Sequence, residues 1–152
     1  MAYTTAEARE QLLDDLGDAA DQLGLALACL TEAYELVDED TADRLEAQLF
    51  RPVQSAYGRA RRTYLEFTSR HGLPLRDFEP QSPGVQSQGA RAFIERAVAA
   101  AGQADQRIAA LQDSMLPVEA GDPPLRAGLT EVRELIDGLP ARARELVRTL
   151  GR

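Results

Sequence analysis

The chain has 152 residues, 44% of them hydrophobic, with 25 acidic and 17 basic side chains and a formal net charge of −8. This length suits one domain with its own core, and the composition excludes a wholly disordered chain. An acidic chain without a concentrated basic stripe is not expected to bind nucleic acid, and no apolar run approaches the ~20 residues that a membrane-spanning helix needs.

Residue usage also carries information about source and compartment. The chain lacks Lys, Asn and Trp, and all of its basic side chains except one His are Arg. Lys and Asn have AT-rich codons, so this usage indicates a GC-rich bacterial genome. The single Cys29 excludes an intramolecular disulfide, and the N-terminal segment has neither the basic nor the apolar region of a secretory signal. We therefore expect a cytoplasmic protein.

Four segments place apolar residues at alternating three- and four-residue spacings, the period of an amphipathic helix and not of a strand. The predicted helices span residues 5–37, 42–70, 87–116 and 123–150. Thr4 or Thr5, Ser87 and Asp122 are the expected N-caps of the first, third and fourth helices, and Gly72 is expected to end the second. The sequence predicts an all-α, antiparallel four-helix bundle that forms a single domain over residues 1–152.

Three features should interrupt this pattern. Pro52 removes a backbone donor and should kink the second helix, and the run Gly138-Leu139-Pro140 should bend or briefly break the fourth. The long connection between the second and third helices, residues 71–86, carries four apolar residues expected to anchor it as a strap over the bundle: Leu73, Leu75, Phe78 and Val85.

The alanine-rich seam of the third helix should approach a neighbour closely. The first helix offers small residues as counterparts, and these are Gly17, Ala20, Gly24 and Ala26. Met115 is expected to continue the apolar seam of the third helix at its C-terminal end.

No constellation for catalysis or metal binding is recognisable. Di-iron bundles use Glu-x-x-His pairs, but the only histidine, His71, follows no such Glu and is expected to interact with a helix C-terminus. The spaced carboxylates of the first helix are expected to form a solvated face, and Cys29 has no base at a suitable spacing, so an inert thiol is expected. The sequence therefore predicts a non-enzymatic protein with no metal site and no cofactor.

The favoured function is that of an interaction or assembly module. Between Leu23 and Leu30 the first helix is apolar around its whole circumference, and its outer acids stop at Asp21 and resume at Glu32. A helix that is apolar on all sides is usually covered on all sides, either by the strap or by another subunit. We expect self-association as a homodimer, or contact with another protein, through an outer patch consisting of Leu25, Ala28 and Cys29.

The alternative is a bundle that binds a small anionic or amphipathic molecule near the strap. The residues predicted to line that site are Tyr57, Tyr64, Arg62, Arg70, His71 and Arg76. Arginine forks suit carboxylates and phosphates, although these arginines could instead pair with the acids of the first helix. Buried tyrosine hydroxyls need partners, and Asp105 is a candidate.

Overall fold

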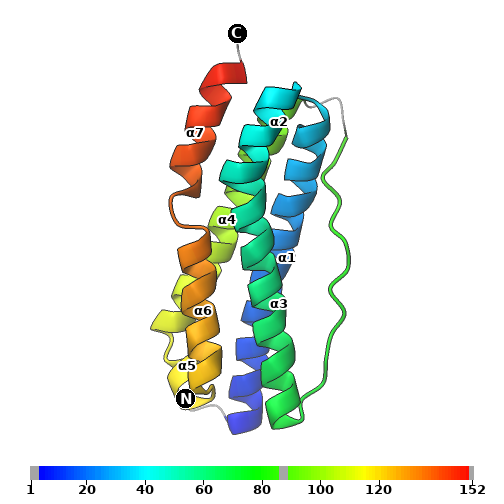
Figure 1. The fold of residues 1–152 in the computed structure, drawn as a ribbon. Helices are drawn as coiled ribbons and strands as arrows, with labels where there is room; N and C mark the ends of the chain where they lie inside the picture. Colours follow the sequence, from blue (N-terminus) through cyan, green and yellow to red (C-terminus); the bar gives the residue numbers. More distant parts are fainter. Residues whose placement is uncertain (1–3, 86–88, 151–152) are drawn as a thin grey trace.

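The computed structural model describes residues 4–85 and 89–150, and every regular element within these ranges is helical (Figure 1). The elements are α1 (Thr5–Glu35), α2 (Glu39–Leu45), the π-helical turn η1 (Glu46–Phe50), α3 (Arg51–His71), α4 (Ala90–Asp113), α5 (Leu116–Glu119), α6 (Pro123–Leu135) and α7 (Leu139–Leu150). The prediction of an all-α chain is confirmed. Among the described helices, none combines the length and the apolar character needed to cross a membrane.

The long helices pack in antiparallel pairs. α1 packs most extensively against α4 and also against α3, while α6 packs against α3 and α7 against α4. α1, α6 and α7 run in one direction and α3 and α4 in the other (Figure 1). Because α3 and α4 run in the same direction, the chain between them must return along the length of the molecule, and it does so as an extended segment beside α1.

Local sequence sets several helix ends where they were predicted. The Thr4 hydroxyl accepts a hydrogen bond from the Glu7 amide at 3.1 Å at the start of α1. Gly72 follows α3 with φ of 62°, a left-handed conformation that glycine adopts readily. Both caps are confirmed. The predicted N-cap Ser87 lies outside the described residues, and Gly89 precedes α4.

Pro52 does more than kink the second predicted helix. That helix is divided into α2, η1 and α3, and the π-helical turn ends at Phe50, two residues before the proline. In a continuous α-helix the residue at position 52 would donate to the Gln48 carbonyl, but proline has no N–H. Arg142 of α7 takes that place, because its Nε donates to the Gln48 carbonyl at 2.9 Å. A side chain distant in sequence thus satisfies the acceptor that the proline leaves free.

The third predicted helix ends earlier than the seam indicated. α4 stops at Asp113, and Met115 has φ of 69° and is 50% exposed, so the prediction that it continues the apolar seam is wrong. The fourth predicted helix breaks as expected, with Gly138 at φ of 76° between α6 and α7. Its apolar phase survives the break, since Ile136 and Leu139 on either side are both buried.

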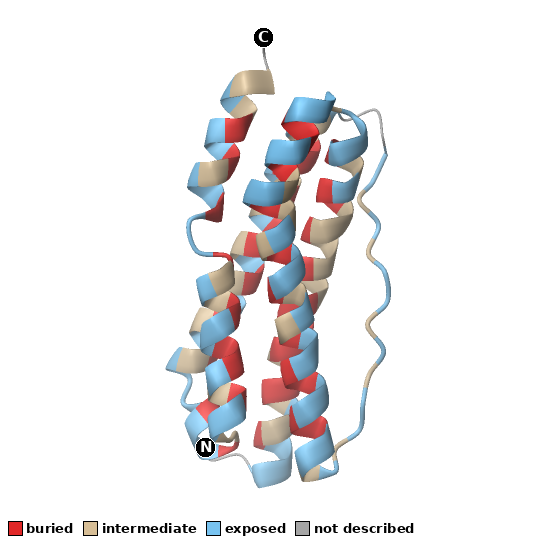
Figure 2. Ribbon diagram, in the orientation of Figure 1, coloured by how far each residue is buried: buried red, intermediate tan, exposed pale blue. Residues whose placement is uncertain are grey.

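Buried side chains lie on the faces that the helices turn toward one another (Figure 2). The small residues of α4 that face the core permit the extensive packing against α1, and these are Ala97, Ala100, Ala101 and Ala104. The expected glycine counterparts on α1 were wrongly assigned. Gly17 lies under the guanidinium of Arg76, and Gly24 lies beside the Tyr57 ring and Gln81. Both glycines therefore face α3 or the connecting segment.

Candidate binding groove between α4, α6 and α7

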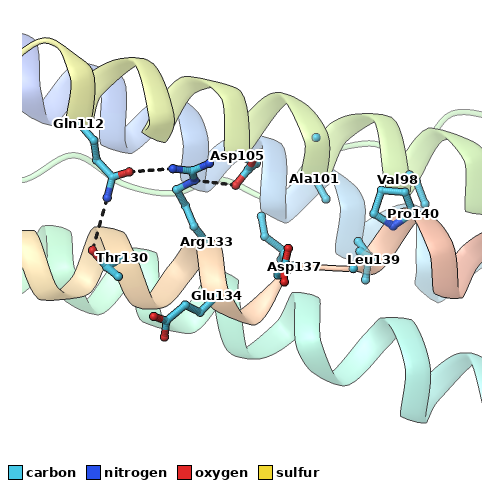
Figure 3. Close-up of a pocket in the computed structure, with 13 residues that line it drawn as sticks. Val98, Ala101, Asp105, Gln112, Thr130, Arg133, Glu134, Asp137, Leu139 and Pro140 are labelled. Atoms are coloured by element: carbon cyan, nitrogen blue, oxygen red, sulfur yellow. Dashed lines mark hydrogen bonds and ion pairs between the residues drawn. The ribbon is translucent and has the colours of Figure 1, made fainter.

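A groove with a volume of about 730 Å³ lies where α4 passes the junction of α6 and α7 (Figure 3). Its apolar part includes side chains from α4 and from the start of α7, namely Val98, Ala101, Leu139 and Pro140. Its polar part lies toward the other end and comes from α4 and α6, namely Asp105, Gln112, Thr130, Arg133 and Glu134, of which Glu134 points away from α4. The groove is therefore amphipathic along its length.

Two local features leave this space open. The interruption between Leu135 and Leu139 ends one helix and starts another, so side chains do not fill the junction as they would along a continuous helix. Opposite it, α4 contributes Ala101 and Gly102, and a methyl group added at Gly102 would meet no atom within 4 Å. A helix break facing small residues thus forms the groove.

A hydrogen-bonded network fixes the polar end. Arg133 donates from Nε to Asp105 at 2.9 Å and from Nη1 to the Gln112 side-chain carbonyl at 3.0 Å. The Gln112 amide in turn lies 3.4 Å from the Thr130 hydroxyl (Figure 3). The hydrogen bond to Asp105 raises the pKa of Arg133 further above its ordinary range. Arg133, the one cation among the described residues that line the groove, is therefore held by a carboxylate of the groove.

Two further carboxylates have no such partner. Glu134 and Asp137 line the groove and are exposed, and neither belongs to an ion pair within the part of the chain that the structure describes. Nearby Arg142 donates to the backbone carbonyls of Gln48 and Asp137 and not to these carboxylates. The groove therefore carries an excess of negative charge together with an apolar surface.

The side chains of the alternative ligand site do not form one site. Arg76 of the strap lies over Gly17, with Nη2 2.7 Å from Asp21 and Nη1 3.8 Å from Asp18. At the C-terminal end of α3, Arg70 and His71 bind a different carboxylate, that of Asp122. Arg62 lies at a third place, beside Glu66 on its own helix, so the predicted cations are separated and each already has a carboxylate partner.

The tyrosines contribute to packing of the strap. Tyr64 is buried and meets the Phe78 ring edge-on, with centroids 5.2 Å apart, while Tyr57 is half-buried with the Arg61 guanidinium 5.4 Å above its ring. Neither tyrosine pairs with Asp105, which binds Arg133 instead. We therefore find a packed contact where the alternative placed a ligand.

The strap is only partly anchored by the residues expected to hold it. Leu73 and Phe78 pack against the core, whereas Leu75 and Val85 are 64% and 66% exposed, so the expectation that these two anchor the strap is wrong. Polar contacts supply anchors that were not predicted, since Arg96 of α4 donates to the Pro83 carbonyl. The strap is therefore held to α1 by Arg76, to α3 by Phe78 and to α4 by the Pro83 carbonyl.

The three residues of the predicted interface patch differ in their burial. Cys29 is fully buried in the core of its own chain, so its assignment to the outer face of α1 is wrong. Burial raises the pKa of the Cys29 thiol, which opposes formation of a reactive thiolate. Leu25 and Ala28 are only partly buried and remain near the surface. Only these two residues could reach another subunit.

Most arginines expected to pair with α1 have other partners. Arg62 lies 3.6 Å from Glu66 on its own helix, and Arg70 binds Asp122 at 2.8 Å. The expectation holds for Arg76. The acids of α1 are satisfied in addition by Arg107 of α4, which was not predicted to bind them.

Sequence reasoning did not find the groove. The break after Leu135 was foreseen, and the acids Glu134 and Asp137 beside it were a visible signal. The packing of the helices decides which helix faces that break. The apolar periodicity of the sequence does not identify that helix. Within the described residues, no three His, Cys, Asp or Glu side chains are grouped so that they could hold a metal ion.

Comparison with known proteins gives no family to which the groove could be referred. No protein-family model matches the chain, and no curated protein and no solved structure show significant similarity to it.

Proposed function

We propose that this chain is a non-enzymatic interaction module, an antiparallel four-helix bundle that binds a helical segment of a partner protein in the groove between α4, α6 and α7. One observation carries the proposal. The groove joins an apolar floor to two exposed carboxylates, Glu134 and Asp137, that no cation of the described chain pairs with. Apolar surface beside unpaired charge is the composition of a recognition surface.

The dimensions favour a protein segment as the ligand. The lining residues on α4 run from Val98 to Gln112, which corresponds to about 21 Å along the helix axis. A helix docks in such a groove through one stripe of side chains at i, i+3, i+4 and i+7 and keeps its other face in water. The exposed positions of Glu134 and Asp137 suit a ligand that is covered on one side only.

A selection experiment tests this proposal without assuming a partner. Gly102→Trp would fill the groove, and Gly58→Trp on the exposed side of α3 is its matched control, because an added methyl group at either glycine meets no atom within 4 Å. A displayed library of random amphipathic helices is selected against the wild type. We expect binders that retain affinity for Gly58→Trp and lose it for Gly102→Trp. A selection that returns no binder with this difference would contradict the proposal.

We also propose self-association through the outer face of α1. The half-buried side chains of Leu25 and Ala28 support it, because they leave apolar surface between the acids Asp21 and Glu32. A twofold contact would bring the same patch of two chains together. Light scattering after size exclusion measures the mass directly, and a monomer at high micromolar concentration would contradict this part of the proposal.

A further inference from the structure

We infer that the groove between α4, α6 and α7 selects a basic amphipathic helix, with apolar anchors for its floor and Lys or Arg side chains for its acidic rim. The inference rests on the proposed function and adds the chemistry of the partner.

The charge balance of the groove favours a cationic ligand. Among the described lining residues there are three carboxylates, from Asp105, Glu134 and Asp137, and one guanidinium, from Arg133. Arg133 is bound to Asp105 at 2.9 Å, so an incoming anion would have to compete with that carboxylate. The other two carboxylates are exposed and belong to no ion pair among the described residues, and the nearby Arg142 donates to backbone carbonyls instead. Complementary charge at such a rim steers association and rejects ligands of like charge.

The shape of the groove favours a helix that approaches closely. On α4 the floor consists of Val98, Ala101 and Gly102, whose small side chains let another backbone come near. Leu139 and Pro140 at the start of α7 form the opposite wall (Figure 3). Ala101 and Leu139 are already buried, so the apolar surface left for a stripe of Leu-like side chains from the partner comes from Val98, Gly102 and Pro140.

Charge and apolar surface are also ordered along the groove. Val98, Leu139 and Pro140 lie at one end, and Asp105 with Arg133 lies toward the other (Figure 3). The unpaired Asp137 lies between the two ends, beside Leu139 (Figure 3), so a partner helix would place basic side chains next to its apolar anchors. This order distinguishes specific docking from general attraction to an acidic protein.

Direct binding of designed peptides tests the inference. The probes are labelled 14-residue helices with Leu at i, i+3, i+4 and i+7. One carries Lys at the flanking positions and the other carries Glu there. Fluorescence anisotropy at about 0.15 M salt, where the Debye length is about 8 Å, limits long-range attraction to the net charge. We expect the Lys peptide to bind the wild type and the Glu peptide to bind at least about tenfold more weakly, since like charges at a contact are unfavourable.

A pair of charge-matched variants separates the groove from the rest of the acidic surface. Glu134→Gln with Asp137→Asn removes the unpaired rim charges, and Glu10→Gln with Asp14→Asn removes two exposed charges from α1. Each pair changes the formal net charge from −8 to −6. For the Lys peptide we expect the groove pair to weaken binding about three- to tenfold, the range of two exposed ion pairs, and the α1 pair to change it less than about twofold.

The outcomes separate this inference from the proposed function. Equal weakening by the two variant pairs, or equal binding of the Lys and Glu peptides, would overturn the preference for a basic helix. If library-selected helices of another charge still lose binding in Gly102→Trp, the groove remains a docking site and only the inferred chemistry is wrong. If no helix, selected or designed, distinguishes Gly102→Trp from Gly58→Trp, the inference and the proposed function both fail.

Discussion

Replacement of Asp122 by Ala should destabilise the protein more than any other single change of a surface charge. Its carboxylate accepts the Leu125 amide at 2.9 Å as the N-cap of α6. The same group binds Arg70 through two hydrogen bonds of 2.8 and 2.9 Å and lies 2.9 Å from Nε2 of His71. One side chain thus begins α6 and joins it to the end of α3.

The expected loss can be worked from these contacts. An N-cap contributes about 1 kcal/mol, and hydrogen bonds to a charged group contribute about 1.5–3 kcal/mol before allowance for exposure. The Arg70 side chain is 34% exposed and that of Asp122 is 17% exposed, which reduces the second figure. We therefore expect Asp122→Ala to lower the free energy of unfolding by about 2–3 kcal/mol, and Asp122→Asn, which keeps a capping oxygen, by about 1 kcal/mol.

The pH dependence gives an independent readout of the same contacts. Partial burial acts to raise the pKa of Asp122, but the hydrogen bonds from Arg70, from the Leu125 amide and from His71 outweigh it. The folded-state pKa therefore lies below the ordinary value of 3.8. A carboxyl with a lowered folded-state pKa contributes its full stability above its unfolded pKa and loses it as the pH falls through the folded value. The wild type should thus lose more stability below about pH 4 than Asp122→Asn does.

Urea denaturation followed by circular dichroism, at neutral pH and at a series of lower pH values, measures both effects. Arg62→Gln is the control, because the Arg62–Glu66 pair is exposed on both sides at 3.6 Å and should contribute less than about 0.5 kcal/mol. A loss of less than about 0.5 kcal/mol for Asp122→Ala would refute the reasoning. The same would follow if the free energy of unfolding of the wild type and of Asp122→Asn fell equally as the pH is lowered.

Three further predictions follow from the packing. Gly102→Ala should raise the free energy of unfolding by up to about 1 kcal/mol, because the site is open and alanine favours the helix. Gly128→Ala should lower the free energy of unfolding, because its methyl group would overlap the buried Thr63 side chain. Urea denaturation of both variants compares these effects directly. Phe78→Ala should cost about 1–2 kcal/mol through the lost ring contact of the strap, and an unchanged denaturation midpoint would show that the strap is not held there. If the chain is dimeric, Leu25→Glu should shift its light-scattering mass toward the monomer while the helical circular dichroism stays constant; a dimer unaffected by this change would place the contact elsewhere.

The sequence alone determined the features that depend on neighbouring residues. Helical periods, the caps at Thr4 and Asp122 and the end of α3 at Gly72 all arise from groups within a few positions of one another. The break near Gly138 was readable for the same reason, since glycine and proline act on their own turn of helix.

Other features were decided by how the helices pack. Apolar periodicity showed that Leu23 and Leu30 face a core, but it did not show that the core extends around α1 as far as Cys29. That extent depends on where α4 lies against α1, and the small side chains of α4 permit a close approach.

The same holds for the polar contacts and for the groove. Arg70 meets Asp122 across 52 positions of sequence, and Arg133 meets Asp105 across 28. An arginine side chain can reach carboxylates on several neighbouring helices, so its type and position do not select its partner. The arrangement of the packed helices makes that selection. It also places α4 opposite the break between α6 and α7, where the groove forms. The sequence by itself determined the helices, their caps and the break, whereas only the tertiary structure decided what lies across from each of them.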